Sequence, residues 1–148
     1  MLENPLKDWE IKRKRLVVQR VLQAGLDFTL ENVPAIVREM SYKVQREKNP
    51  GDCPLYSTKP CHGEVLDLNC FLCACPNYLS EKKDEQGEFT GGCSVNCKSG
   101  KWIVNYPSPA GKVWSCEGCS GFHRGVVVEE YLKTHISQYS FLAESLKK

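Results

Sequence analysis

Closely spaced cysteines are the residues of this chain that could do chemistry. The stretch NCFLCACPNY contains Cys70, Cys73 and Cys75, and the stretch CEGC contains Cys116 and Cys119. Two cysteines separated by two residues can turn both sulfurs toward one metal ion within a single tight turn. Two such pairs would supply the four thiolates of a tetrahedral zinc site, with a loop spanning the long interval between them. The spacing therefore predicts a metal site.

Further cysteines and one histidine extend this candidate site. Cys93 and Cys97 are separated by three residues, a ligand spacing that suits a turn or a helix. The predicted metal ligands are Cys61, Cys70, Cys73, Cys75, Cys93, Cys97, Cys116, Cys119 and His123. Their division between one and two sites stays open, as does metal binding by Cys53 and His62. We expect His135 to be structural or exposed.

The sulfur ligands leave two metals to consider. Zinc and an iron–sulfur cluster both accept four thiolates, so ligand type does not separate them. Zinc is the predicted metal and a [4Fe-4S] cluster is the alternative. The run CFLCACP has a proline after its third cysteine, as some cluster-binding loops do, but lacks the full ferredoxin spacing. A colourless, air-stable protein would favour zinc, whereas a brown, oxygen-sensitive protein would favour the cluster.

The cysteine count argues against a disulfide scaffold. The chain has 148 residues and nine cysteines, an odd number, and its first residues lack the apolar stretch of a signal peptide. Clustered thiols in a reducing compartment are more often metal ligands or redox groups than disulfides. No run approaches the roughly 18 apolar residues of a membrane span. We therefore expect a soluble, cytoplasmic protein with no membrane association.

Helices are predicted at both ends of the chain. In residues 6–24 the apolar positions recur with a period closer to 3.6 than to 2, and Gly25 is a plausible stop. A second helix is predicted from Asn32, with Pro34 in its first turn, up to the sequence Asn-Pro-Gly at 49–51. The tail predicts a helix over residues 126–146, with a broad apolar face.

The middle of the chain, residues 52–124, is predicted to be irregular. It contains five of the eight prolines. Short strands are predicted at residues 101–106 and 112–114, and the polar residues 80–92 are predicted to form an exposed loop. Because such a segment has few large apolar groups to bury, metal–thiolate bonds would have to hold it in place.

These elements predict a small α+β fold. An irregular cysteine-rich, metal-bound core with short strands would pack against N-terminal helices and a C-terminal helix. Residues 1–51 would form a helical N-terminal extension. Residues 52–148 would form the cysteine-rich metal-binding domain, which includes the C-terminal helix.

Four stretches of the chain resemble one known family. The stretches PCHG, NCFLCACPNY, GGC and VWSCEGCSGFHRGVVVEEYL occur in the order found in the cysteine-rich small domain family, which is zinc-finger-like and presumed to bind metal. Together with the residues between them they cover about half of the chain. Members occur alone or attached to enzymes, including some of cobalamin biosynthesis. The resemblance implies a metal site built from Cys61, Cys70, Cys73, Cys75, Cys116 and Cys119, with His123 as a further candidate. It implies no particular reaction.

The chain departs from this family at several positions. Gly125 follows Arg124 where the family tends to have proline, and Ala74 stands where an aromatic residue commonly precedes the third cysteine. Cys53 and Cys97 lie outside the matching part, as does the helical head. These features would suit a subfamily with an added metal site or partner surface.

The predicted function is metal binding at one or more thiolate-rich sites. Structural zinc would support an interaction with a protein partner or an accessory role. An iron–sulfur protein with a redox or enzyme-accessory role is the alternative. A nucleic-acid-binding zinc protein is the third reading, based on the basic segment Lys12–Arg15, although a net charge of +2 is balanced for such a role. Whether the protein is an enzyme stays open, because no H-E-x-x-H, G-x-S-x-G or phosphate-loop motif is present and no small-molecule substrate is indicated.

Overall fold

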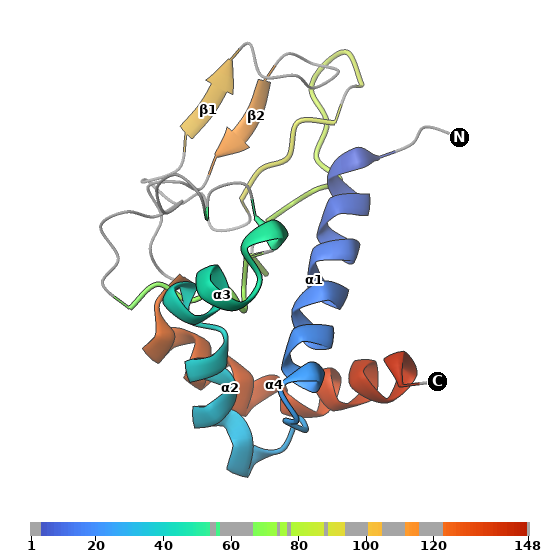
Figure 1. Ribbon diagram of the computed structural model, residues 1–148. Helices are drawn as coiled ribbons and strands as arrows, with labels where there is room; N and C mark the ends of the chain where they lie inside the picture. Colours follow the sequence, from blue (N-terminus) through green and yellow to red (C-terminus); the bar gives the residue numbers. More distant parts are fainter. Residues whose placement is uncertain are drawn as a thin grey trace. The chain divides into compact units, whose positions relative to one another are not determined.

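The computed structural model divides the chain into two compact units (Figure 1). It describes residues 4–53, 56, 67–73, 75–76, 78–87, 89–93, 101–104, 112–115 and 123–147, with the backbone alone described at Pro5, 101–104 and 112–115. We call the first unit, Lys14–Cys73 with Ser120–Lys148, the helical unit. The second, Met1–Arg13 with Ala74–Cys119, is called the ribbon unit.

Helix α1 (Pro5–Gln23) has clear signals at both of its ends. The side chain of Asn4 accepts hydrogen bonds from the backbone N–H groups of Leu6 and Lys7, each at 3.1 Å, and so caps the first turn. Gly25 follows the helix with a φ of 80°, a left-handed conformation that glycine adopts without steric cost. The predicted helix and its stop are confirmed.

The second predicted helix is in fact two helices. Helix α2 spans Val33–Glu39, with Pro34 in its first turn as predicted, and α3 spans Tyr42–Lys48. The extended Ser41 separates them, and its hydroxyl accepts a hydrogen bond from the Val44 N–H at 3.3 Å. The prediction of one continuous helix is wrong here, because this serine caps a new helix instead of continuing the old one.

The tail forms α4 (Gly125–Leu146), which confirms the predicted C-terminal helix. Its one non-helical residue is His135, with φ −114° and ψ 18°, and the helix is kinked there. The neighbouring Thr134 hydroxyl donates to the Glu130 carbonyl at 3.1 Å, a side-chain bond that often accompanies bending.

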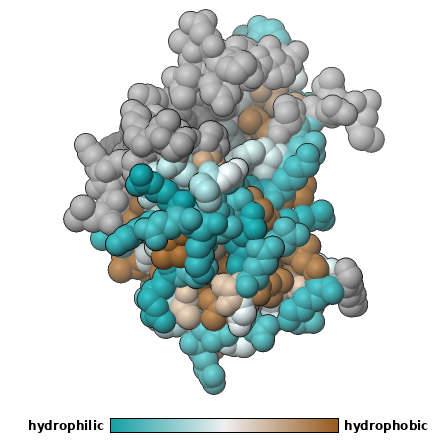
Figure 2. Space-filling view, in the orientation of Figure 1, coloured by the Kyte–Doolittle hydropathy of each residue, from teal (hydrophilic) through white to brown (hydrophobic). Residues whose placement is uncertain are grey.

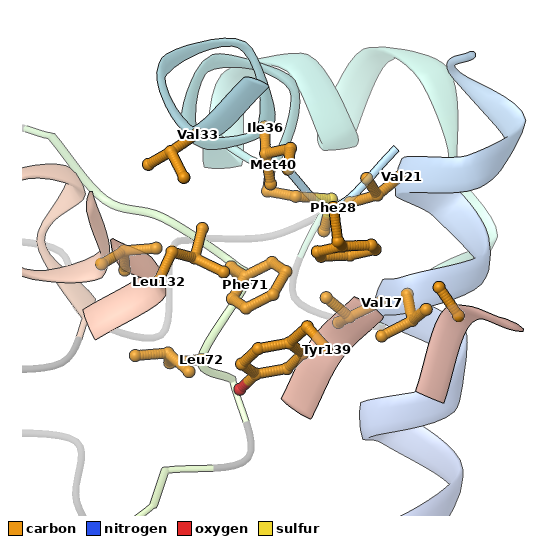
Figure 3. Packing of buried hydrophobic residues seen from close by; sticks show 13 residues of the cluster. Val17, Val21, Phe28, Val33, Ile36, Met40, Phe71, Leu72, Leu132 and Tyr139 are labelled. Atoms are coloured by element: carbon orange, nitrogen blue, oxygen red, sulfur yellow. The ribbon is translucent and has the colours of Figure 1, made fainter. Parts of the chain in front are cut away.

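The core of the helical unit is apolar. Rings of Phe28, Phe71 and Tyr139 lie together, with ring centroids 4.9–6.1 Å apart (Figure 3). The full buried cluster is Val17, Val18, Val21, Phe28, Val33, Ile36, Met40, Phe71, Leu72, Val128, Leu132, Tyr139 and Ala143. Burying each large side chain contributes about 1.5–3 kcal/mol. Helices α1, α2 and α4 supply most of these residues, so their amphipathic stripes build the core.

The predicted α+β class is therefore wrong, since the described part of the chain is mainly helical. Its four α-helices hold 19, 7, 7 and 22 residues, whereas β1 (Lys101–Val104) and β2 (Lys112–Ser115) hold four each. The two strands pair antiparallel, with Trp102 opposite Trp114. The predicted cysteine-rich core is also corrected for the described residues, because the buried cluster of the helical unit is made of apolar residues without cysteine, and Cys70 packs against it only partly buried.

The rest of the described ribbon unit is a chain reversal within residues 78–93. Tyr78 pairs with Cys93, and Lys83 pairs with Phe89, in isolated antiparallel bridges. At the turn, the Gly87 N–H donates to the Asp84 carbonyl at 3.0 Å. The prediction of an exposed loop over residues 80–92 holds for its middle, where five of the six residues 81–86 are exposed, but not for its ends, where Ser80 and residues 90–92 are buried.

The visible face of the described helices carries many hydrophilic side chains, interspersed with apolar ones (Figure 2). Within the described residues, no helix has both the length and the apolar composition that crossing a bilayer requires. The predicted division of the chain at residues 51 and 52 stays a prediction.

Candidate metal-binding site

The cysteines of the first C-x2-C pair lie on one tight turn of the helical unit. The Cys73 N–H donates to the Cys70 carbonyl at 3.3 Å, which closes the turn. The two intervening residues, Phe71 and Leu72, are only 4% and 2% exposed and belong to the apolar core. Cys70 and Cys73 are both half-buried. The turn is thus anchored by its middle residues, while its two cysteines keep partial access to the surface.

Hydrogen bonds hold the chain that leads into this turn. The Cys70 N–H donates to the Met40 carbonyl at 2.7 Å, and the Asn69 N–H donates to the His123 carbonyl at 2.8 Å. The buried Asn69 side chain donates to the Val37 carbonyl at 2.7 Å and accepts from the Phe71 N–H at 2.9 Å. Since these partners come from α2, from the α2–α3 junction and from the residues just before α4, the turn is fixed to the helical unit.

One side chain contacts a candidate ligand directly. The Tyr56 hydroxyl donates a hydrogen bond to the Cys70 sulfur at 3.3 Å. Tyr56 was missed by sequence reasoning, because no spacing rule marks a tyrosine 14 residues before a cysteine. It lies two residues beyond Cys53-Pro54, and nothing in that pattern indicates a contact with a thiol.

The remaining described candidates lie at several places. His123 is buried in the helical unit, where Cys53 is half-buried. In the ribbon unit, Cys93 is buried, and the Tyr78 N–H donates to the carbonyl of the half-buried Cys75 at 3.0 Å. The other predicted candidates, Cys61, His62, Cys97, Cys116 and Cys119, lie outside the described residues.

Within the described ranges, no three His, Cys, Asp or Glu side chains are gathered closely enough to hold a metal ion. The described residues place Cys70 and Cys73 on one turn, and four of the nine predicted ligands lie outside them. The predicted ligand set therefore stays a prediction.

One histidine and two tyrosines of α4 are the remaining titratable groups near the apolar core. His135 is half-buried, and its ring lies 4.3 Å from that of Tyr131. Burial raises the pKa of Tyr139 well above its ordinary value, and the neighbouring Tyr131 raises it further. These groups belong to the apolar core and its edge, and we assign them no chemical role.

Comparison of the chain with models of known families, with curated proteins and with solved structures gives no match. The resemblance to the cysteine-rich small domain family thus stays a prediction based on its motifs.

Proposed function

We propose that this chain is a thiolate metal-binding protein, with Cys70 and Cys73 as two ligands of a structural zinc ion. The observation that supports the proposal best is the Cys70–Cys73 turn. Its central residues are buried in the core, Asn69 and Cys70 hydrogen-bond to the Val37, Met40 and His123 carbonyls, and both its cysteines are half-buried. A rigid turn of this kind presents two sulfurs at low entropic cost, which suits the short Zn–S bonds of about 2.3 Å.

Two sulfurs leave a tetrahedral zinc ion with two further ligands to find. We propose that they come from the predicted set, above all Cys61, Cys116, Cys119 and His123. His123 is the one of these that the structure describes, and its carbonyl accepts a hydrogen bond from the residue next to Cys70. Bound zinc would fix these chain segments to one another, which is the usual contribution of a closed thiolate site.

We propose a structural role that supports a protein-interaction or accessory function in the cytoplasm, where thiols stay reduced. An iron–sulfur cluster remains the alternative, because it would use the same sulfur donors. We do not adopt the nucleic-acid-binding reading. Arg20 forms a two-pronged ion pair with Asp52, and the Lys14 ammonium lies 5.7 Å from the centre of the Tyr139 ring, so two basic residues of α1 have partners within the protein.

Elemental analysis of the full chain, purified without oxygen, tests this proposal together with an absorption spectrum. We expect one or two zinc ions per chain and no visible band. Cys73→Ser should lower the zinc content and the thermal stability, whereas Phe141→Ala, at an exposed position of α4, is the control and should leave both unchanged. A wild-type chain without metal, or a Cys73→Ser variant with full metal content and stability, would contradict the proposal. Iron with sulfide and a broad visible band would select the cluster instead.

A further inference from the structure

We infer that Tyr56 is a positioning residue for the metal site, whose hydroxyl donates a hydrogen bond to the metal-bound sulfur of Cys70. This inference rests on the proposed function. It goes beyond it by assigning a role to a residue that is not itself a metal ligand.

The contact itself suits a thiolate. The Tyr56 oxygen lies 3.3 Å from the Cys70 sulfur, and Tyr56 is only 4% exposed. The sulfur of a neutral thiol is a weak acceptor, whereas hydrogen bonds to an ionised acceptor are about twice as strong as neutral ones. Because a metal-bound cysteine carries a thiolate, metal binding strengthens the hydrogen bond that is already in place.

The ring of Tyr56 is held from the side by α3. Tyr42, the first residue of that helix, meets the Tyr56 ring nearly edge-on, with the ring centroids 5.4 Å apart and an interplanar angle of 72°. Edge-to-face pairs of this kind are favourable and directional. The start of α3 is in turn fixed by the Ser41 cap. Packing against Tyr42 therefore sets the orientation of the Tyr56 ring and, with it, the direction of the Tyr56 hydroxyl.

The backbone of Cys70, which carries the sulfur, is hydrogen-bonded to the same α2–α3 junction. The Cys70 N–H donates to the Met40 carbonyl at 2.7 Å, and the Tyr42 N–H donates to the Leu68 carbonyl at 2.9 Å. The donor and the acceptor of the Tyr56–Cys70 contact are thus both anchored within three residues of the α2–α3 junction. Small motions elsewhere in the chain would change this contact little.

The segment that carries Tyr56 is also tied to α1. The Tyr56 N–H donates to the Cys53 carbonyl at 3.1 Å. Just before it, both carboxylate oxygens of Asp52 accept hydrogen bonds from the Arg20 guanidinium at 2.7 Å. Two-pronged arginine–carboxylate pairs are geometrically specific. This ion pair holds the backbone before Tyr56, so the tyrosine does not depend on its ring contact alone.

A hydrogen bond to a metal-bound sulfur has measurable consequences. It orients the ligand and withdraws charge from the sulfur, and loss of such contacts around metal sites typically weakens binding 10- to 100-fold. Such a hydrogen bond also shifts the energy of the sulfur-to-metal charge-transfer absorption band of a bound transition metal such as cobalt(II). Both effects would be absent if Tyr56 served only to fill space.

Cobalt(II) titration of the full chain, followed by absorption and then by competition with zinc, tests the inference. Tyr56→Phe keeps the ring that Tyr42 packs against and removes only the hydroxyl. We expect it to weaken metal binding by about 10-fold or more and to shift the sulfur-to-cobalt band. Tyr139→Phe is the matched control, because it removes the hydroxyl of another buried tyrosine and keeps its ring, and it should change neither readout.

A second variant leaves the hydroxyl in place. Arg20→Gln breaks the ion pair with Asp52 and should give a smaller loss of affinity in the same direction. If Tyr56→Phe binds cobalt like the wild type and gives the same spectrum, the inference is overturned and the proposed function stands. If Tyr139→Phe has as large an effect as Tyr56→Phe, the role is one of stability and the inference is also overturned. A wild-type chain that binds neither metal overturns both proposals.

Discussion

The helical unit and the ribbon unit reach order by different physical means. In the helical unit, thirteen buried residues pack into one apolar cluster, and the helices follow from the spacing of those residues. Among the described residues of the ribbon unit, Cys93 is the only buried hydrophobic one, and its buried neighbours are polar residues and glycines. For the described residues, the comparison teaches that the segment 78–93 is organised by backbone and side-chain hydrogen bonds with little burial of apolar side chains.

Polar contacts in the ribbon unit join the first turns of α1 to Ser80. The Asn4 side chain donates to the Ser80 carbonyl at 2.9 Å, and the Ser80 hydroxyl donates to Glu10 at 2.7 Å. Gly91 has a φ of 73° and lies against Tyr78, so close that a Cβ there would clash with the tyrosine oxygen. Hydrogen bonds and one tight aromatic–glycine contact thus hold the described residues of this unit.

The largest expected effect tests the apolar core. Leu132 on α4 is completely buried, and Leu132→Ala should lower the free energy of unfolding of the helical unit by about 3–4 kcal/mol, because it leaves a cavity. The control is Phe141→Ala on the same helix, where the ring is 80% exposed and the expected change is within about 0.5 kcal/mol. Urea denaturation followed by circular dichroism measures both. Equal effects would show that α4 is not held by its buried face.

A smaller effect tests the paired segment 78–93 of the ribbon unit. Gly91→Ala should destabilise it by about 2–3 kcal/mol, because a left-handed backbone is costly for alanine and the new methyl group meets Tyr78. Gly87→Ala is the matched control, since Gly87 has a φ of 81° but nothing within 4 Å of the added Cβ, and it should cost about 1 kcal/mol.

Amide hydrogen exchange at Leu79 reads out this difference, because its N–H donates to the Gly92 carbonyl across the ribbon. If both glycine variants accelerate exchange equally, the Tyr78–Gly91 contact contributes nothing.

The smallest effect concerns pH. Burial raises the pKa of Tyr139 above the ordinary value of 10.0, so this residue keeps its proton in the folded state when the unfolded state has begun to lose it. Its contribution to stability is complete below pH 10 and declines as the pH rises above it. Between pH 10 and 11 the wild type should lose about 1 kcal/mol more than Tyr139→Phe in urea titrations. Parallel losses would place the Tyr139 hydroxyl in contact with water.

Apolar periodicity was enough to predict α1 and α4, because those helices bury one continuous stripe each, whereas Asn32 and Pro34 predicted the start of α2. It missed the break at Ser41, where a serine hydroxyl and a hydrogen bond from Cys70 to Met40 outweigh a continuous apolar pattern. It also missed the bridges within residues 78–93, since the pairing of Tyr78 with Cys93 and of Lys83 with Phe89 follows no period in the sequence.

In the candidate site, too, local features could be predicted from the sequence and features that depend on tertiary structure could not. The Cys70–Cys73 turn could be predicted from its spacing, because a two-residue interval is a local property of the chain. The burial of Phe71 and Leu72, which anchors the turn, depends on helices far away in the sequence. The contact from Tyr56 depends on tertiary structure altogether and could not be read from the residues alone.

The central claim is that an apolar helical core, which needs no metal, supports a Cys70–Cys73 turn that binds one. Amide hydrogen exchange of the full chain, compared between the metal-loaded state and the chelator-treated state, tests it most directly. We predict that metal removal accelerates exchange at Cys70 and Cys73 by at least tenfold while Val128 and Leu132 in α4 stay protected. Unchanged exchange at the two cysteines, or an equal loss of protection in α4, would contradict the claim.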